Sequence, residues 1–329
     1  MAASIHPSSF ILHPYHKGMA VYTLAWNEMP PGSCRGGALA IGNFAGVHRG
    51  HLALLAELRR QAVAVGGPAV AVTFDPHPLQ LLRPEQFQPL LTTVADRAAL
   101  LEANGADQVV ILRTTPDLLQ LSAEEFFSRV VRAQLAARAM VEGVNFGFGH
   151  NREGDVEMLR RLCAAAGLLL AVVPPLTANG VTISSSRVRD ALVRGDAREA
   201  AALLGRPYRL RGTVGTGQRR GQQLGFPTAN LELAETLVPG DGVYAVRVHH
   251  QGTVWPGAAN IGPNPTFGEQ ARKVEVHLIG FQGDLYGQVL AADFIERLRD
   301  TRPFDGVAQL VEQLRLDVER ARQIAGPAP

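Results

Sequence analysis

Residues 42–51 read GNFAGVHRGH, and this stretch decides how the first half of the chain folds. An apolar run at residues 38–41 comes directly before it, and apolar side chains recur at helical spacing through residues 52–65. The stretch therefore predicts a strand that turns into a helix through a glycine-rich corner. His48 and His51 stand three residues apart, so they share one face of the first helical turn.

The same corner predicts a site for an anionic ligand. The N-terminus of a helix attracts anions through its free amides and its dipole, and imidazole N–H groups at that point are placed to bind nucleotide phosphates. Two other interpretations stay open: half of a metal site, and a pair of ordinary surface histidines. Metal pairs on helices usually come with a glutamate or cysteines at fixed spacing, whereas this chain has only Cys34 and Cys163, far apart.

Composition limits the class of protein. The 329 residues suffice for one large or two medium domains, and a hydrophobic content of 46% allows well-packed cores. The net charge of +2 speaks against binding through bulk charge, so we expect no nucleic-acid partner. The only lysines are Lys17 and Lys273, and the GxxxxGK[ST] motif does not occur. Any nucleotide is therefore bound without a Walker-type lysine.

The sequence also carries signals of location. Two lone cysteines fit a reducing compartment, and no apolar run reaches the length of a transmembrane helix. Residues 1–20 lack the charged and long apolar regions of a signal peptide. We therefore expect a cytoplasmic protein without a membrane partner, a disordered extension at residues 1–20, and Met19 as an alternative translation start.

Strands and helices alternate through the first two-thirds of the chain. The pattern predicts strands at residues 70–74, 108–112, 139–144 and 168–173 and helices at residues 94–104, 123–136 and 155–166. Short buried strands alternating with helices favour an α/β fold with a doubly wound parallel sheet. In such sheets ligands bind at the carboxyl ends of the strands.

After Gly205 the pattern changes to short strands and turns. The predicted strands are residues 208–214, 229–233, 243–249, 253–258, 273–279 and 289–294, and helical spacing returns only at residues 307–324. Many short strands with one terminal helix indicate a small antiparallel β-barrel. We place the boundary near Gly205, which gives domains of residues 21–205 and 206–329.

Three further stretches of the first domain have both a functional and a structural interpretation. TFDPHP at residues 73–78 positions a polar substrate or is simply a rigid loop. GVNFGFGHNREGD at residues 143–155 stacks a ring on its two phenylalanines or fills the core with them. SSSRVRDAL at residues 184–192 begins with a plain serine N-cap or forms a phosphate clamp of hydroxyls and Arg187.

Two stretches of the second domain suggest chemistry. LGFPTANL at residues 224–231 follows a glycine-rich segment that lacks the GxGxxG pattern. Its Thr228 and Asn230 are neutral oxygen ligands suited to a hydrated Mg²⁺ on a nucleotide. Glu275 lies in the alternating strand VEVHL, where a carboxylate usually faces solvent. If it instead faces a cavity, it can take the proton of an attacking alcohol.

Together these motifs resemble the bacterial bifunctional riboflavin kinase/FMN adenylyltransferase (FAD synthetase) family from about residue 38 to residue 325. The family patterns GxFDGxHxGH, [ED]PHP, [DN]FxFG and ISS[ST]xxR match residues 42–51, 75–78, 145–149 and 183–189. The patterns GxPTAN, GVYA, NIGxxPTF and VEVH match residues 225–230, 242–245, 260–267 and 274–277.

The resemblance implies two ATP-dependent reactions on small-molecule substrates. Riboflavin becomes FMN at the barrel, and FMN then becomes FAD, with release of pyrophosphate, at the first domain. It implies Glu275 as the catalytic base of the first reaction, His48 and His51 as catalytic residues of the second, and Mg²⁺ at Thr228 and Asn230. The implied nucleotide- or flavin-binding residues are Gly42, Phe44, Gly46, Asn145, Ser184, Ser185, Arg187, Gly225, Pro227, Thr228 and Asn230.

Two departures from the family pattern bear on activity. Ala45 stands where the family has aspartate. Losing a cap there costs about 1 kcal/mol, and losing a group that positions metal or nucleotide costs about 2.7 kcal/mol, a hundredfold in rate. We expect weakened adenylyl transfer. Gln222 replaces an arginine often found in the glycine loop, which predicts a raised KM for ATP that Gln222→Arg lowers.

Two alternative functions stay open, and Ala45 motivates the first of them. The first is a monofunctional riboflavin kinase with a degenerate adenylyltransferase domain. The second is a non-catalytic protein that senses flavin.

Overall fold

The computed structural model describes residues 21–178, 180–216, 221, 224–233, 236–263 and 271–328. The chain divides into two compact units, one of Met1–Gln88 with Val94–Ile183 and one of Pro89–Thr93 with Ser184–Pro329. The extension predicted at residues 1–20 and the departure at Gln222 lie outside the described residues.

The first unit is built on a six-stranded parallel sheet with the order β1-β4-β3-β2-β5-β6. Its strands are β1 (Val21–Leu24), β2 (Ala38–Ile41), β3 (Ala69–Asp75), β4 (Gln108–Arg113), β5 (Ala139–Gly143) and β6 (Leu169–Val173). The longer helices are α1 (Arg49–Val65), α3 (Val94–Ala103) and α6 (Val156–Ala166). The short elements are η1 (Gly32–Cys34), η2 (Ala45–Val47), α2 (Pro78–Leu82), η3 (Pro84–Gln86), α4 (Pro116–Gln120), η5 (His150–Arg152), β7 (Thr177–Ala178) and β8 (Val181–Thr182).

Hydrophobic side chains cover both faces of this sheet. One core cluster joins the strands to α1 and α3, and a second joins them to α6 and to the segment formed by α5 (Ala123–Phe126) and the π-helix η4 (Phe127–Gln134). All four residues of β2 are buried, as the apolar run predicts for a central strand. The predicted doubly wound α/β fold is confirmed, and β2 and β5 flank the point where the strand order reverses.

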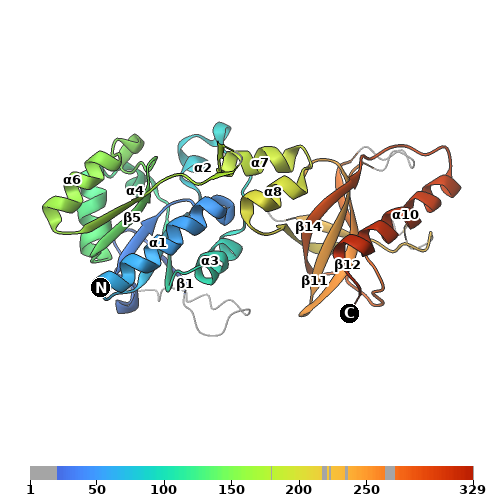
Figure 1. Ribbon diagram of the computed structural model, residues 1–329, viewed down its shortest axis with the longest axis horizontal. Coiled ribbons are helices and arrows are strands. Elements are labelled where there is room, and N and C mark those ends of the chain that lie inside the picture. Colours follow the sequence, from blue (N-terminus) through green and yellow to red (C-terminus); the bar gives the residue numbers. More distant parts are fainter. Residues whose placement is uncertain are drawn as a thin grey trace, which may run out of the picture. The chain divides into compact units, whose positions relative to one another are not determined.

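The second unit contains a closed antiparallel barrel with the order β10-β13-β12-β11-β14-β9. Its strands are β9 (Tyr208–Gly215), β10 (Ala229–Leu233), β11 (Gly242–His250), β12 (Thr253–Gly262), β13 (Lys273–Leu278) and β14 (Val289–Arg299). Gln251 and Gly252 connect β11 to β12 with φ values of 46° and 80°, as a tight hairpin turn requires. The terminal helix α10 (Val307–Ala325) lies along the outside of the barrel (Figure 1). The predicted barrel with its terminal helix is confirmed.

The second compact unit consists of Pro89–Thr93 and Ser184–Pro329, so it includes the two helices that precede the barrel in the sequence. The helices α7 (Ser185–Val193) and α8 (Ala197–Leu204) pack against each other, and α8 also contacts β9 and β14. Helix α8 packs against these elements because it carries an apolar stripe, and the contacts bury the side chains of that stripe. The buried side chains are Ala197, Ala200, Leu203 and Leu204.

Candidate functional site

The corner between β2 and α1 is a tightly wound turn at the carboxyl edge of the sheet. Phe44, Gly46 and Val47 have positive φ values of 45°, 75° and 42°, and the short turn η2 lies between the two elements. The Gly42 amide still donates to the Val72 carbonyl at 2.9 Å, so β2 stays attached to β3 up to the corner. The backbone of the predicted residues Gly42, Phe44 and Gly46 is thereby brought to the start of α1.

Only the backbone of Phe44 is available to a ligand at this corner, because its side chain is 3% exposed and belongs to the hydrophobic core. Its ring meets the ring of His51 edge-on, with 5.3 Å between the centroids. We conclude that the Phe44 side chain supports an imidazole.

His48 and His51 form a stacked pair, with 3.7 Å between ring centroids and 17° between ring planes. The His48 backbone amide donates to Nδ1 of His51 at 3.3 Å, which leaves Nε2 of His51 as the position for the ring proton. Burial, and secondarily the neighbouring His48, lowers the pKa of His51 well below its ordinary value of 6.5. At neutral pH His51 is therefore a neutral hydrogen-bond donor.

The metal interpretation of this pair gains no support. Within the part of the chain that the structure describes, no group of three or more histidine, cysteine, aspartate or glutamate side chains could hold a metal ion. Two stacked imidazoles without a further ligand fall short of the usual four-coordinate zinc site.

The loop after β5 lies at the same edge of the sheet, because β5 is the parallel neighbour of β2. Asn145 is exposed there, and its carbonyl accepts a hydrogen bond from Nη2 of Arg152 at 3.1 Å. Phe146 stacks on Phe148 at 5.4 Å between centroids, and Phe148 is buried in the core. The core-filling interpretation thus holds for Phe148, while Asn145 and half-buried Phe146 lie where a ligand can reach them.

The loop after β3 shows a structural use for His77. Its Nδ1 accepts a hydrogen bond from the Leu79 amide at 3.1 Å, so the ring caps α2. The rigid-loop interpretation of TFDPHP accounts for this contact.

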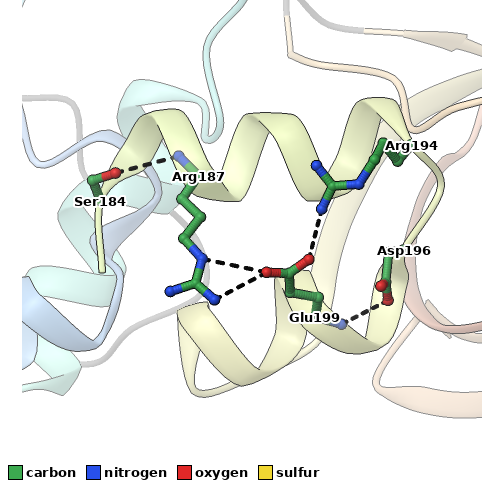
Figure 2. Close-up of polar contacts among 5 residues, drawn as sticks. All are labelled: Ser184, Arg187, Arg194, Asp196 and Glu199. Atoms are coloured by element: carbon green, nitrogen blue, oxygen red, sulfur yellow. Dashed lines mark hydrogen bonds and ion pairs between the residues drawn. The ribbon is translucent and has the colours of Figure 1, made fainter. Parts of the chain in front are cut away.

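The serine-rich stretch forms the start of α7 (Figure 2). Oγ of Ser184 accepts from the Arg187 amide at 3.3 Å, so the plain N-cap interpretation accounts for Ser184, and Ser185 is the first helical residue. Nε and Nη2 of Arg187 donate to Oε1 of Glu199 at 3.3 and 3.2 Å, and Nη2 of Arg194 donates to Oε2 of the same carboxylate at 2.7 Å. A phosphate on Arg187 must therefore share the guanidinium with Glu199.

These α7 residues and the two histidines belong to different compact units.

On the barrel, three polar side chains form a row across neighbouring strands. Asn230 on β10 and Asn260 on β12 both lie directly opposite Glu275 on β13. Side chains opposite each other in an antiparallel pair share a face and have Cβ atoms about 4.5–5.5 Å apart. All three are half-buried, and they share the outer face of the barrel because the residues between them, such as Ala229 and Val276, fill its inside.

Asn260 is the residue that sequence reasoning left out of the site. The predicted strand stopped at residue 258, whereas β12 continues to Gly262 and carries Asn260 into register with Glu275. The NIG pattern that begins at residue 260 is the signal that points to it.

A cavity of about 330 Å³ opens beside the PTAN segment. Pro227 and Thr228 form part of its wall, together with the aromatic side chains of Phe281 and Tyr286. The Pro227 carbonyl is in hydrogen-bond contact with Nδ1 of His277 at 2.8 Å, which attaches this segment to β13. The cavity thus combines apolar walls, two aromatic rings and a hydroxyl, as small-molecule sites do.

The remaining wall of the cavity comes from the barrel strands and from the turn before β14. Its other residues are Val214, Ala229, Val276, Leu278, Gly283, Asp284 and Leu285. Gly225 is also a predicted binding residue. It is exposed, has a φ of +84° and lies two residues before Pro227 of the PTAN segment.

Known proteins match this chain over both units. The FAD synthetase family model matches residues 32–187, and the riboflavin kinase family model matches residues 204–325. A bifunctional riboflavin kinase/FMN adenylyltransferase from Pseudomonas fluorescens is 40% identical over 295 residues, which cover 89% of this chain and 94% of that protein. The protein of the same name from Escherichia coli (strain K12) is 35% identical over 301 residues, which cover 91% of this chain and 95% of that protein.

A solved structure agrees with the fold as a whole. The crystal structure of a protein described as a macrolide-efflux protein from Streptococcus pneumoniae has a TM-score of 0.83 at 31% identity. It covers 92% of this chain and 98% of its own chain. The described residues of the present chain include no helix that is long and apolar enough to span a membrane.

An α/β sheet that matches FAD synthetases, followed by a barrel that matches riboflavin kinases, defines a two-domain enzyme of flavin nucleotide synthesis. The chain belongs to the bifunctional riboflavin kinase/FMN adenylyltransferase family, and the recognition made from its motifs is confirmed.

Proposed function

We propose that the chain converts riboflavin and ATP to FMN at the barrel, and FMN and a second ATP to FAD and pyrophosphate at the parallel sheet. The order of the two family matches along the chain supports this division. We assign adenylyl transfer to residues 21–205 and the kinase step to residues 206–329, because the riboflavin kinase match begins at residue 204. We place the enzyme in the cytoplasm, with riboflavin, FMN and ATP as its small-molecule substrates.

At the barrel, the row of Asn230, Glu275 and Asn260 supports a kinase mechanism. Glu275 accepts the proton of the ribityl hydroxyl as its oxygen attacks the γ-phosphorus of ATP. The bond between that phosphorus and the bridging oxygen breaks, and ADP leaves. The two flanking amides are positioned to hold the carboxylate in the orientation that this proton transfer needs.

The donor set around the PTAN segment fits a divalent cation carried by ATP. Enzymes of both families use ATP and typically a divalent metal, and Mg²⁺ prefers a few protein oxygens completed by phosphates and waters. Thr228 and Asn230 would supply neutral oxygens, and Thr228 lies on the wall of the cavity. When bound, the cation neutralises developing charge on the transferred phosphoryl group.

At the parallel sheet, the chemistry needs no base. The phosphate of FMN is already an anion, and its oxygen attacks the α-phosphorus of ATP while the bond to the leaving pyrophosphate breaks. Nε2 of His51 and the amides at the start of α1 donate to the phosphate oxygens on which charge accumulates. His48 fixes the orientation of the His51 ring by stacking and through its own backbone amide.

We assign binding roles to the remaining predicted residues. Asn145 seats flavin or nucleotide at the edge shared by β2 and β5. The phosphate-binding residues at the start of α7 are Ser184, Ser185 and Arg187. Arg187 is paired with Glu199, so a bound phosphate replaces part of that ion pair.

The observation that carries the proposal is the presence of both matched domains in one chain. The test is a time course of purified protein with riboflavin, ATP and Mg²⁺, with products separated by chromatography. We expect FMN to rise first and FAD to follow. A second incubation that starts from FMN isolates adenylyl transfer. Failure to form FMN in the first incubation rejects the kinase assignment, and failure to form FAD in the second rejects the adenylyltransferase assignment.

A monofunctional riboflavin kinase is the second candidate, and Ala45 is the observation that favours it. Ala45 begins the short turn η2 directly before the histidines, so a missing carboxylate there acts on the adenylyltransferase site alone. FMN without FAD in the time course supports this candidate. Flavin binding without turnover of ATP in either incubation supports the non-catalytic sensor.

A further inference from the structure

Helix α3 places a buried arginine beneath the carboxyl edge of the parallel sheet. Arg97 is 3% exposed. Its Nη1 donates to the Asn43 carbonyl at 3.0 Å, and its Nη2 donates to the Phe74 carbonyl at 2.8 Å. One planar guanidinium therefore joins the loop after β2 to the end of β3.

Both of these carbonyls belong to segments that border the proposed nucleotide site. Asn43 lies in the GNFAGVHRGH corner, five residues before His48, and Phe74 directly precedes Asp75, the last residue of β3. Oγ1 of Thr73 lies 3.5 Å from the same Asn43 carbonyl. The corner and the end of β3 are thus held together by two side chains, those of Arg97 and Thr73, at a single backbone oxygen.

Arg97 remains a cation in this environment. Burial lowers its pKa to about 10, and the nearby carboxylate of Asp75 acts in the opposite direction. A buried charge is unfavourable unless polar groups compensate it. Its two described partners are carbonyls, which compensate the charge without neutralising it.

Two buried polar atoms at and beside the Arg97 guanidinium lack a hydrogen-bond partner among the described residues. These atoms are Nε of Arg97 and Oδ1 of Asn43. Buried polar atoms are normally satisfied by protein, water or ligand. These two atoms lie next to the backbone that forms the corner.

We propose that Arg97 is a positioning residue for adenylyl transfer. Its guanidinium fork sets the spacing between the corner after β2 and the end of β3, and its buried charge adds positive potential where the ATP phosphates bind. The inference rests on the proposed placement of ATP at this edge of the sheet. Arg97 differs from His51 because it acts through the backbone of these two segments.

The test compares Arg97→Lys with Arg97→Met in the full-length protein. Lysine keeps the charge but lacks the planar fork, so we expect an ATP KM close to that of the wild type and a clear fall in kcat for FAD formation from FMN. Methionine removes both properties, so we expect a higher ATP KM and a loss in kcat of roughly a hundredfold, the size that small misplacements produce. Guanidinium at millimolar concentration should restore part of the activity of Arg97→Ala.

Two controls separate positioning from a structural role. Arg59→Met changes an exposed arginine of α1 in the same unit and should leave both steps unchanged. Riboflavin phosphorylation by the same chain reports on the barrel and should be equal in all variants. Folded Arg97→Met with wild-type kcat and KM for adenylyl transfer overturns the proposal.

If Arg97→Met does not fold, the Arg97→Lys variant provides the test. A kcat for FAD formation from FMN that equals the wild-type value in Arg97→Lys then overturns the proposal. A wild-type protein that forms no FAD from FMN rejects the proposed function itself, which is a separate outcome.

Discussion

Asn260 on β12 lies directly opposite Glu275 on β13, and this pairing completes a row of amide, carboxylate and amide across three strands. The row lies on the outer face of the barrel, beside the segment that carries Thr228. Side chains that lie opposite each other in an antiparallel pair are close neighbours on one face. A carboxylate flanked by two amides is the arrangement that the proposed proton acceptor for an alcohol requires.

The first prediction concerns Glu275→Gln. The amide cannot accept the ribityl proton, so we expect riboflavin phosphorylation to fall by about 10²–10⁴-fold. FAD formation from FMN should stay at the wild-type rate, because it takes place in the other unit. Glu312→Gln on the exposed side of α10 is the matched control and should change neither rate. Equal kinase rates in Glu275→Gln and in the wild type would show that Glu275 is not the base.

The second prediction concerns His51. Replacing it by alanine removes the proposed donor to the phosphates, and loss of such a donor typically costs 10²–10³-fold, so we expect FAD formation to fall by about that factor. Glutamine keeps a side-chain N–H and should recover part of the rate. The kinase rate of the same protein is the internal control.

The lowered pKa of His51 also fixes the direction of the pH dependence. Because the folded protein keeps this ring neutral below the ordinary imidazole pKa, the FAD-forming rate should not begin to fall at about pH 6.5. Stopped assays across the acid range measure this limb. A rate that halves near pH 6.5 and loses that feature in His51→Gln would contradict the assignment.

Much of the fold follows from local sequence patterns. The buried run before the corner predicts β2, glycine at residue 46 fits the positive φ of the turn, and alternation in VEVH predicts β13. The edge strand β1 was missed, since only Leu24 of its four residues is buried and the apolar signal is weak. The helix predicted at residues 123–136 begins as the α-helix α5 and continues as the π-helix η4. The spacing of apolar residues predicts a helix here but does not distinguish an α-helix from a π-helix.

The site is less predictable because its supporting contacts join distant residues. The spacing of His48 and His51 is local, and the structure shows the two rings stacked. The partner of Arg187 is Glu199 on the next helix, and that of Arg97 is a carbonyl in another loop. Such pairs depend on tertiary packing, which one sequence does not specify residue by residue.

The third prediction concerns Ala45→Asp. The residue begins η2 and is half-buried, between the left-handed Phe44 and Gly46. A carboxylate here restores the family residue, and we expect faster FAD formation from FMN, by up to roughly a hundredfold if it positions metal or nucleotide. The change should leave riboflavin phosphorylation unaltered. Ala45→Asn separates charge from shape, and equal FAD formation in Ala45→Asp and the wild type means that this side chain does not limit the step.

The fourth prediction concerns a buried carboxyl group beside the same corner. Glu142 on β5 is 2% exposed, and its Oε1 accepts a hydrogen bond from the Ile41 amide at 2.8 Å. Burial raises the pKa of Glu142 well above 4.5, and the Ile41 amide only partly opposes that shift. A raised pKa in the folded state means that stability is full below the unfolded pKa of about 4.5 and is lost as pH rises toward the folded pKa.

The first unit should therefore become less stable with rising pH above about 4.5, by at most about 1.4 kcal/mol per pH unit from this one proton. Glu142→Gln keeps the acceptor for Ile41 and should remove that slope. Urea unfolding can be followed through Trp26 in a Trp255→Phe background, which confines the fluorescence signal to the first unit. Glu57→Gln is the opposite control, because a hydrogen bond from Arg60 lowers the pKa of Glu57 and makes its contribution grow with pH. Parallel stability curves for Glu142→Gln and the wild type would mean that Glu142 does not fold in its protonated form.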